Sequence, residues 1–93
     1  MDIEIKEKQH TGMVFIGKEE DPKAEMQFVR ESKELINVKH TKVAEELQGQ
    51  HVGKKLLDHL AEKARQENTK IKAECSYVQH VFEKYDDYDD VQH

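Results

Sequence analysis

The chain has 93 residues, of which 38% are charged and 35% hydrophobic, so it provides for one small, well-solvated domain with a limited core. Its formal net charge of -5 argues against a protein that binds nucleic acid through a general positive surface. The single cysteine, Cys75, excludes an internal disulfide and suits a reducing compartment. Because the sequence has no long apolar run and no signal-peptide pattern, we expect a soluble cytoplasmic protein without a membrane partner.

The first half of the chain alternates between apolar segments and turn residues, which indicates β-structure. Four segments are expected to be strands: residues 3–6, 13–16, 24–28 and 35–43. The segments between them, at residues 9–12, 17–23 and 31–34, are rich in glycine or charged residues and are expected to be turns or loops. Four strands joined by short connections predict an antiparallel sheet.

The second half begins with a helix that starts near Gly53. Its apolar residues recur at helical spacing and form one stripe: Val52, Leu56, Leu57, Leu60, Ala61 and Ala64. Asn68 is expected to end this helix, and residues 71–75 then alternate as a short fifth strand. A strand, a crossover helix and a strand form a β-α-β unit, so the fifth strand should lie parallel to the fourth.

A second helix is expected after Cys75. Ser76 and Gln79 have the spacing of a capping box, with Ser76 as the N-cap residue. An apolar face continues to Tyr85, where we place the end of a single domain over residues 1–85. Residues 86–93 are acidic and are expected to be a frayed, solvated tail.

The turn between the fourth strand and the first helix is the most informative segment. Residues 48–51 are polar and contain Gly49, and the helix that follows begins with amide groups that have no intrahelical partner. Those donors and the positive end of the helix dipole predict an anion site suited to phosphate. Lys54 and Lys55 oppose the dipole unless an anion binds there, whereas the alternative is an ordinary glycine turn with two solvated lysines.

Two residues are candidates for acid–base or nucleophilic chemistry. Cys75 is expected at the start of a helix, a position that favours the thiolate, although a free cysteine is also commonly a small buried apolar residue. His40 could act as a general base or pair with Cys75, or it could be an ordinary strand residue. The remaining histidines lack metal-ligand spacing, so no metal site is expected.

The segment 48–53 resembles the acetyl-coenzyme A signature of the GNAT N-acetyltransferase superfamily, in which Gln48 and Gly53 match the pattern and His51 stands where the first signature glycine is expected. The pairs His40-Thr41 and Cys75-Ser76, with the tyrosines that follow, resemble a compact single-domain subfamily of that superfamily over nearly the whole chain.

The resemblance implies a GNAT-like α+β fold, with coenzyme A entering between the fourth and fifth strands. It implies contacts of the cofactor with ten residues: Thr41, Lys42, Val43, Gln48, Gly49, Gln50, His51, Val52, Gly53 and Lys54. The turn at 48–53 would hold the pyrophosphate, and the acyl group would end near Cys75 and His40, the two expected catalytic residues. The first signature glycine supplies freedom for positive φ, which His51 lacks.

The function expected from the sequence is acyl transfer from acetyl-CoA to an unidentified amine or thiol. Transfer could be direct, with His40 as base, or could pass through an acetyl-Cys75 thioester. The alternatives are a non-catalytic acetyl-CoA-binding module and a protein-interaction domain that uses the acidic tail. Nothing in the sequence calls for a dimer, so a monomer is expected.

Overall fold

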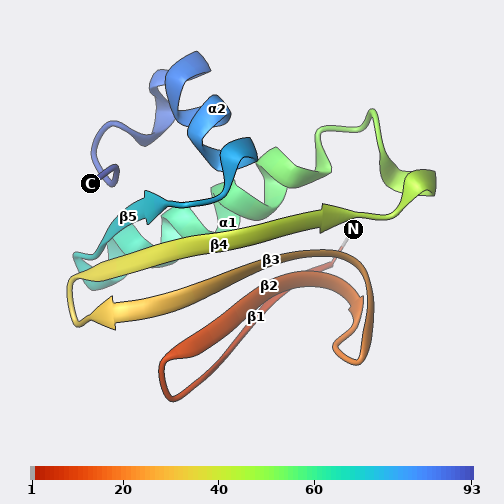
Figure 1. Cartoon of the computed structure of the whole chain (residues 1–93), viewed down its shortest axis with the longest axis horizontal. Coiled ribbons are helices and arrows are strands. Elements are labelled where there is room, and N and C mark those ends of the chain that lie inside the picture. The colour runs from red at the N-terminus through yellow and green to blue at the C-terminus, as the bar shows by residue number, and fades with distance from the viewer. Residues whose placement is uncertain (1) are drawn as a thin grey trace.

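Five strands form one mixed sheet whose order in space is the order of the chain, β1-β2-β3-β4-β5 (Figure 1). The computed structural model describes residues 2–93. The strands are β1 (Ile3–Lys8), β2 (Thr11–Lys18), β3 (Asp21–Ser32), β4 (Leu35–Val43) and β5 (Lys70–Ala73). The helices are α1 (Val52–Glu67) and α2 (Ser76–Lys84), with short 3-10 turns η1 (Glu45–Leu47) and η2 (Asp86–Tyr88).

The strand directions confirm the predicted α+β topology. Strands β1 to β4 pair antiparallel in succession, and β5 pairs parallel with β4 from Leu35 opposite Lys70 to Val38 opposite Ala73. The predicted loop at 17–23 is wrong, because β2 and β3 extend through most of it. Pro22 lies near the start of β3 opposite Gly17, beside an irregularity in the register where a missing N–H is tolerated.

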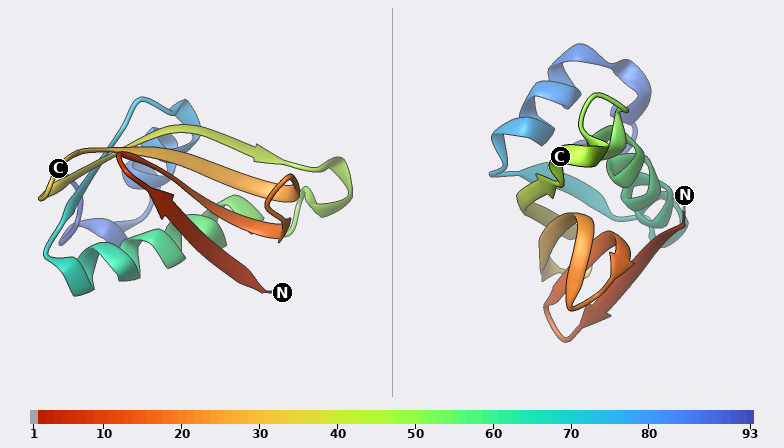
Figure 2. Two further views of the ribbon diagram at one scale, coloured as in Figure 1. Left: turned by 90° about the horizontal axis from the view of Figure 1, so that it is seen from below. Right: turned by 90° about the vertical axis from the view of Figure 1, so that its right-hand side faces the viewer.

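Helix α1 packs its apolar stripe against the sheet. The predicted stripe is confirmed, since Leu56, Leu57 and Leu60 are completely buried. Figure 2 shows α1 running along the sheet, and the helix contacts all five strands. Asn68 ends α1 in the left-handed conformation, with its backbone N–H donating to the carbonyls of Ala64 and Arg65.

Helix α2 lies at the β5 edge and packs on β4 and β5 (Figure 1). The predicted capping box is wrong: Cys75 is the N-cap residue, Ser76 is already helical, and no side chain caps this end. Gln79 instead donates from Nε2 to the carbonyl of Ala73, 2.9 Å away, and so ties α2 to the end of β5. Within residues 2–93, neither helix has the length and apolar character needed to cross a bilayer.

The acidic segment 86–93 differs from the expected frayed tail because it packs against β5 and α1. Tyr88 and Val91 are buried, at 1% and 2% exposure. Ile71 donates to the carbonyl of Val91 and accepts from the backbone N–H of His93, which covers the outer edge of β5. Arg65 pairs with Asp90 at 2.7 Å, so the acidic residues are partly neutralised where the segment docks.

Candidate functional site

The site begins where β4 and β5 separate. The register of β3 and β4 shifts at Lys39, an extra residue between Val38 and His40. The ladder between β4 and β5 ends at Val38, whose carbonyl accepts the backbone N–H groups of both Glu74 and Cys75, at 3.0 and 3.1 Å. The rest of β4, residues 39–43, therefore has an edge that β5 does not pair, and the two chain segments diverge from this point.

The start of α1 faces the opening between them. The expectation that His51 lacks the freedom for positive φ is wrong, because His51 precedes the helix in the left-handed region, with φ 58 and ψ 31. It makes no side-chain capping bond. The first intrahelical donor is Lys55, which bonds to the His51 carbonyl at 3.1 Å. The amides of Val52, Gly53 and Lys54 thus lack intrahelical acceptors and carry the positive end of the helix dipole.

A cleft of about 360 Å³ joins these two features. It is lined by Thr41, Val43, Leu47, Gln48, Gly49, His51, Val52, Gly53 and Tyr77. Thr41 and Val43 come from the unpaired part of β4, and the others come mainly from the turn and the first residues of α1. Gln48 connects the turn to the end of β4, because its Nε2 donates to the carbonyl of Val43 at 3.2 Å.

Three of the ten predicted cofactor residues do not line this cleft. Lys42 is exposed and alternates with Thr41, so its side chain leaves the opposite face of β4. Gln50 donates from Nε2 to the carbonyl of Glu46 at 3.4 Å, within the turn itself.

Lys54 points away from the cleft and holds the C-terminal segment. Its Nζ lies 3.4 Å from Asp58 and 3.5 Å from Asp87, and 4.8 Å from the centre of the Tyr85 ring. Burial opposes its charge, but hydrogen bonds to Tyr88 and Asp58 and the negative charge of Asp58 raise the pKa of Lys54 above its ordinary value. The cost of a lysine in a first helical turn is therefore offset by acidic and aromatic partners rather than by a cofactor phosphate.

Sequence reasoning missed two residues that line the cleft, Leu47 and Tyr77. The Tyr77 ring lies over the start of α1, so that a Cβ added at Gly53 would come within 2.7 Å of it. Gly53 therefore lets the α2 aromatic ring approach the α1 backbone. Tyr77 is 37% exposed, and burial raises the pKa of its hydroxyl. The only sequence signals were an apolar residue inside a polar turn and the position of Tyr77 two residues after Cys75.

The two candidate catalytic residues lie on different sides of β4. Cys75 is nearly buried, at 8% exposure, and its Sγ lies 3.3 Å from Oγ1 of Thr41. Thr41 is opposite the buried Met26, on the face that α1 covers. His40 is exposed and lies opposite Gln27, so it leaves the other face. The structure brings Thr41, and not His40, to the thiol.

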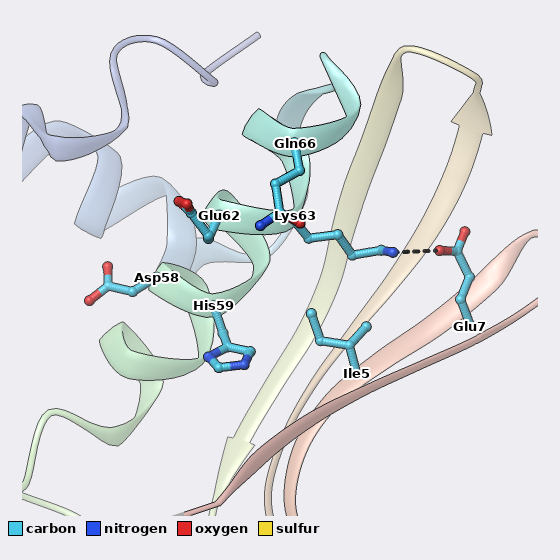
Figure 3. A pocket seen from close by; sticks show the side chains of 7 residues that line it. All are labelled: Ile5, Glu7, Asp58, His59, Glu62, Lys63 and Gln66. Carbon is cyan, nitrogen blue, oxygen red and sulfur yellow. Dashed lines mark ion pairs between the residues drawn. The ribbon is translucent and has the colours of Figure 1, made fainter.

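A second groove, of about 440 Å³, lies between β1 and α1, away from this cleft (Figure 3). It is lined by Ile5, Glu7, Asp58, His59, Glu62, Lys63 and Gln66. Figure 3 shows the Lys63 side chain reaching toward Glu7, with Nζ and Oε1 4.0 Å apart. Glu7 is also bound by Arg30, whose Nη2 lies 3.0 Å from Glu7 Oε1 and 2.9 Å from Glu67 Oε1. Much of the charge in this groove is thus already paired, and none of the predicted site residues lies in it.

A family model covers most of the chain. Residues 13–91 match the family model described as GCN5-related N-acetyl-transferase. The chain belongs to the GCN5-related N-acetyltransferase (GNAT) family. It is similar to a GCN5-like protein from Staphylococcus aureus whose solution structure was determined by NMR, with 43% identity over 97% of this chain and 87% of that chain, and a TM-score of 0.76.

More distant GNAT structures share the fold. A ribosomal-protein-alanine N-acetyltransferase from Brucella melitensis biovar Abortus 2308 has 16% identity and a TM-score of 0.67, over 83% of this chain and 62% of that chain. A GNAT family acetyltransferase from Elizabethkingia anophelis, solved with acetyl-CoA bound, has 21% identity and a TM-score of 0.62, over 82% and 53%. The chain therefore spans only about half to three fifths of these two larger proteins. None of the curated proteins compared with the chain matches it.

Proposed function

We propose that the protein binds acetyl-CoA in the cleft between β4 and the start of α1 and transfers its acyl group to an amine or thiol. The observation that carries this proposal is that one cleft is bordered by an edge of β4 without a strand partner and by helix amides without intrahelical acceptors. The unpaired edge of β4 at residues 39–43 and the first amides of α1 both face it. Membership in the GNAT family supports the same reading.

The residues present fit the cofactor. The amides of Val52, Gly53 and Lys54 would hold the pyrophosphate, because donors at a helix start suit phosphate oxygens. The amide-containing pantetheine arm would lie along the free edge of β4, beside Thr41 and Val43, where it can replace the missing strand partner. When bound, the cofactor would supply an activated acyl thioester.

Two routes of transfer remain compatible with the site. In the direct route, a deprotonated amine attacks the thioester carbonyl, the carbon–sulfur bond breaks and the thiol form of coenzyme A leaves. In the covalent route, the Cys75 thiolate would attack the thioester carbonyl, the carbon–sulfur bond to coenzyme A would break and coenzyme A would leave. The acceptor would then attack the acyl-Cys75 thioester and release the Cys75 thiolate. The Thr41 hydroxyl beside Cys75 favours the second route, while His40, on the other face of β4, could serve as base only for an acceptor that approaches from that face.

The main alternative is a non-catalytic acetyl-CoA-binding module. It predicts binding of acetyl-CoA without turnover on any amine. An interaction domain based on the acidic tail is less well supported, because Tyr88 and Val91 are buried within the domain.

The single free thiol suits the reducing cytoplasm in which we expect the protein to act.

Calorimetry with acetyl-CoA, followed by intact mass, tests the proposal. Gly53→Asp would place a carboxylate beside the expected phosphates, and Gly53→Ala is the matched control because either side chain must displace the Tyr77 ring. We expect the parent and Gly53→Ala to bind and Gly53→Asp to lose at least about tenfold in affinity. A gain of one acetyl group that disappears in Cys75→Ala would support the covalent route. Absence of binding by the parent would refute the proposal.

A further inference from the structure

A buried asparagine lies next to the point where β4 and β5 separate. Asn37 in β4 has no exposed surface. Its Nδ2 donates to Oε2 of Glu31 and to Oε2 of Glu74, both at 2.9 Å. Its Oδ1 accepts the backbone N–H of Glu74 at 3.2 Å. Both donor hydrogens and the acceptor of this amide are therefore used, as a buried polar group requires.

These bonds act on the residues that end the ladder. The Glu74 amide is shared between Asn37 Oδ1 and the carbonyl of Val38, and the Cys75 amide donates to the same Val38 carbonyl. A regular parallel ladder has evenly spaced bonds, so two successive amides on one carbonyl mark the end of pairing. Asn37 holds the backbone of Glu74 in this arrangement, and Cys75 follows directly.

Each glutamate that accepts a hydrogen bond from Asn37 also pairs with a lysine. Lys72 lies 3.0 Å from Glu31, and Lys39, the extra residue in β4, lies 2.7 Å from Glu74. Lys72 and then Asn37 lower the pKa of Glu31, and Lys39 and then Asn37 lower the pKa of Glu74. Both carboxylates are thus ionised at neutral pH and can accept the bonds that Asn37 donates.

We propose that Asn37 is a positioning residue for the cofactor cleft: its side chain fixes the point at which β4 and β5 separate and thereby the position of the Cys75 thiol. Asn37 does not line the cleft and acts only through Glu74 and Cys75. The identity of the ligand rests on the function proposed above, whereas the control of Cys75 can be tested without any ligand.

Asn37→Leu is the informative variant because it has a similar volume and makes none of the three bonds. Thr69→Val is its matched control: Thr69 is also buried, and its hydroxyl donates to the carbonyl of Lys33 at 3.3 Å just before the opposite end of β5. Cys75 is the only thiol in the chain, so intact mass follows its alkylation by iodoacetamide. We expect Asn37→Leu to accelerate alkylation about tenfold and Thr69→Val to change it less than about twofold.

A second measurement compares the affinity for coenzyme A with the affinity for a ligand that lacks the pantetheine arm. Coenzyme A and 3′-phosphoadenosine 5′-diphosphate share the pyrophosphate, but only coenzyme A has the pantetheine arm that would reach the point of separation. We expect Asn37→Leu to weaken coenzyme A about tenfold while the shorter ligand stays within about twofold. Equal losses for both ligands would instead indicate general damage and would overturn the proposal.

Variants at Glu74, an exposed partner of Asn37, provide the test if Asn37→Leu does not fold. Glu74→Gln retains an oxygen that can accept from Asn37, whereas Glu74→Ala removes it, so only Glu74→Ala should accelerate alkylation. Equal alkylation rates in these two variants, or in Asn37→Leu and Thr69→Val, would overturn the proposal. If the parent binds neither ligand, the proposed function fails, and the alkylation rates alone decide the role of Asn37.

Discussion

The Thr41 hydroxyl lies 3.3 Å from the Cys75 thiol and connects β4 with the start of α2 across the point where the strands separate. A hydroxyl in this position can donate to the thiolate, the nucleophilic form of cysteine. Thr41→Val keeps the shape of the side chain and removes the donor. We expect it to slow the alkylation of Cys75 at pH 7.5 about tenfold.

Thr41→Ser is the control for this effect because it retains the hydroxyl. Its alkylation rate should stay close to that of the parent. An unchanged rate in Thr41→Val would show that the contact contributes only packing.

His51 holds a left-handed conformation that costs a non-glycine residue roughly 1 kcal/mol. His51→Gly should therefore raise the free energy of unfolding by about 1 kcal/mol, measured with urea. Asn68→Gly is a useful comparison, since Asn68 is also left-handed but asparagine tolerates this region better, so its gain should be smaller.

The same His51→Gly protein tests what holds the cofactor phosphates. Since backbone amides are the proposed donors, its affinity for coenzyme A should stay within about threefold of the parent, measured by calorimetry. A large loss of affinity in a protein that is more stable than the parent would assign the phosphate contact to the imidazole instead.

The C-terminal segment should contribute measurably to stability. The buried Tyr88 hydroxyl donates to Asp58 on α1, beside Lys54. Tyr88→Phe leaves the ring in place but removes this bond, so we expect a loss of about 1–2 kcal/mol in urea unfolding. Tyr85→Phe is the control, since the Tyr85 hydroxyl makes no hydrogen bond to another residue within 2–93. Equal stability of the two variants would mean that the Tyr88 hydroxyl contributes nothing and that the other contacts hold the segment in place.

Acid should weaken the contact between β3 and the end of α1. Burial tends to raise the pKa of Glu67, but hydrogen bonds from Lys63 and Arg30 outweigh it and lower the pKa below its ordinary value. The folded state therefore binds this proton less readily than the unfolded state. The stabilisation that the Glu67 carboxylate contributes is complete above the unfolded pKa of about 4.3. It is lost as the pH falls through the lower folded pKa.

Urea unfolding of the parent and Glu67→Gln tests this pH dependence. The two proteins should differ most at pH 7 and converge toward pH 3. A difference that persists unchanged to pH 3 would contradict the assignment.

The elements that could be predicted from the sequence are those specified by local pattern. The apolar stripe of α1 and the left-handed Asn68 are local signals, and the parallel direction of β5 follows from the length of the crossover. The acidic segment misled the prediction because its charges indicate solvation, whereas its position depends on burying Tyr88 and Val91 against distant residues. The capping box failed for a similar reason, since Gln79 binds the β5 carbonyl of Ala73.

The candidate site also contains residues that local sequence could place and residues whose position depends on packing. Residues 48, 49 and 51–53 form the turn and the first residues of α1, a nearly contiguous segment, so they could be placed at the cleft from the sequence. Tyr77 comes from another element, and its approach depends on how α2 packs. Lys54 follows the cleft residues directly, yet its side chain faces the C-terminal segment, because the direction of a helical side chain is set by the neighbours around the helix.

The central claim, that the β4–α1 cleft is the coenzyme A site, is tested most directly by titrating ¹⁵N-labelled protein with coenzyme A and following the backbone amide signals by NMR. The account predicts the largest shifts at residues 49–54 and 41–43, with little change at His59 and Gln66 in the groove of Figure 3. Shifts centred on that groove, or no shifts at millimolar coenzyme A, would contradict it.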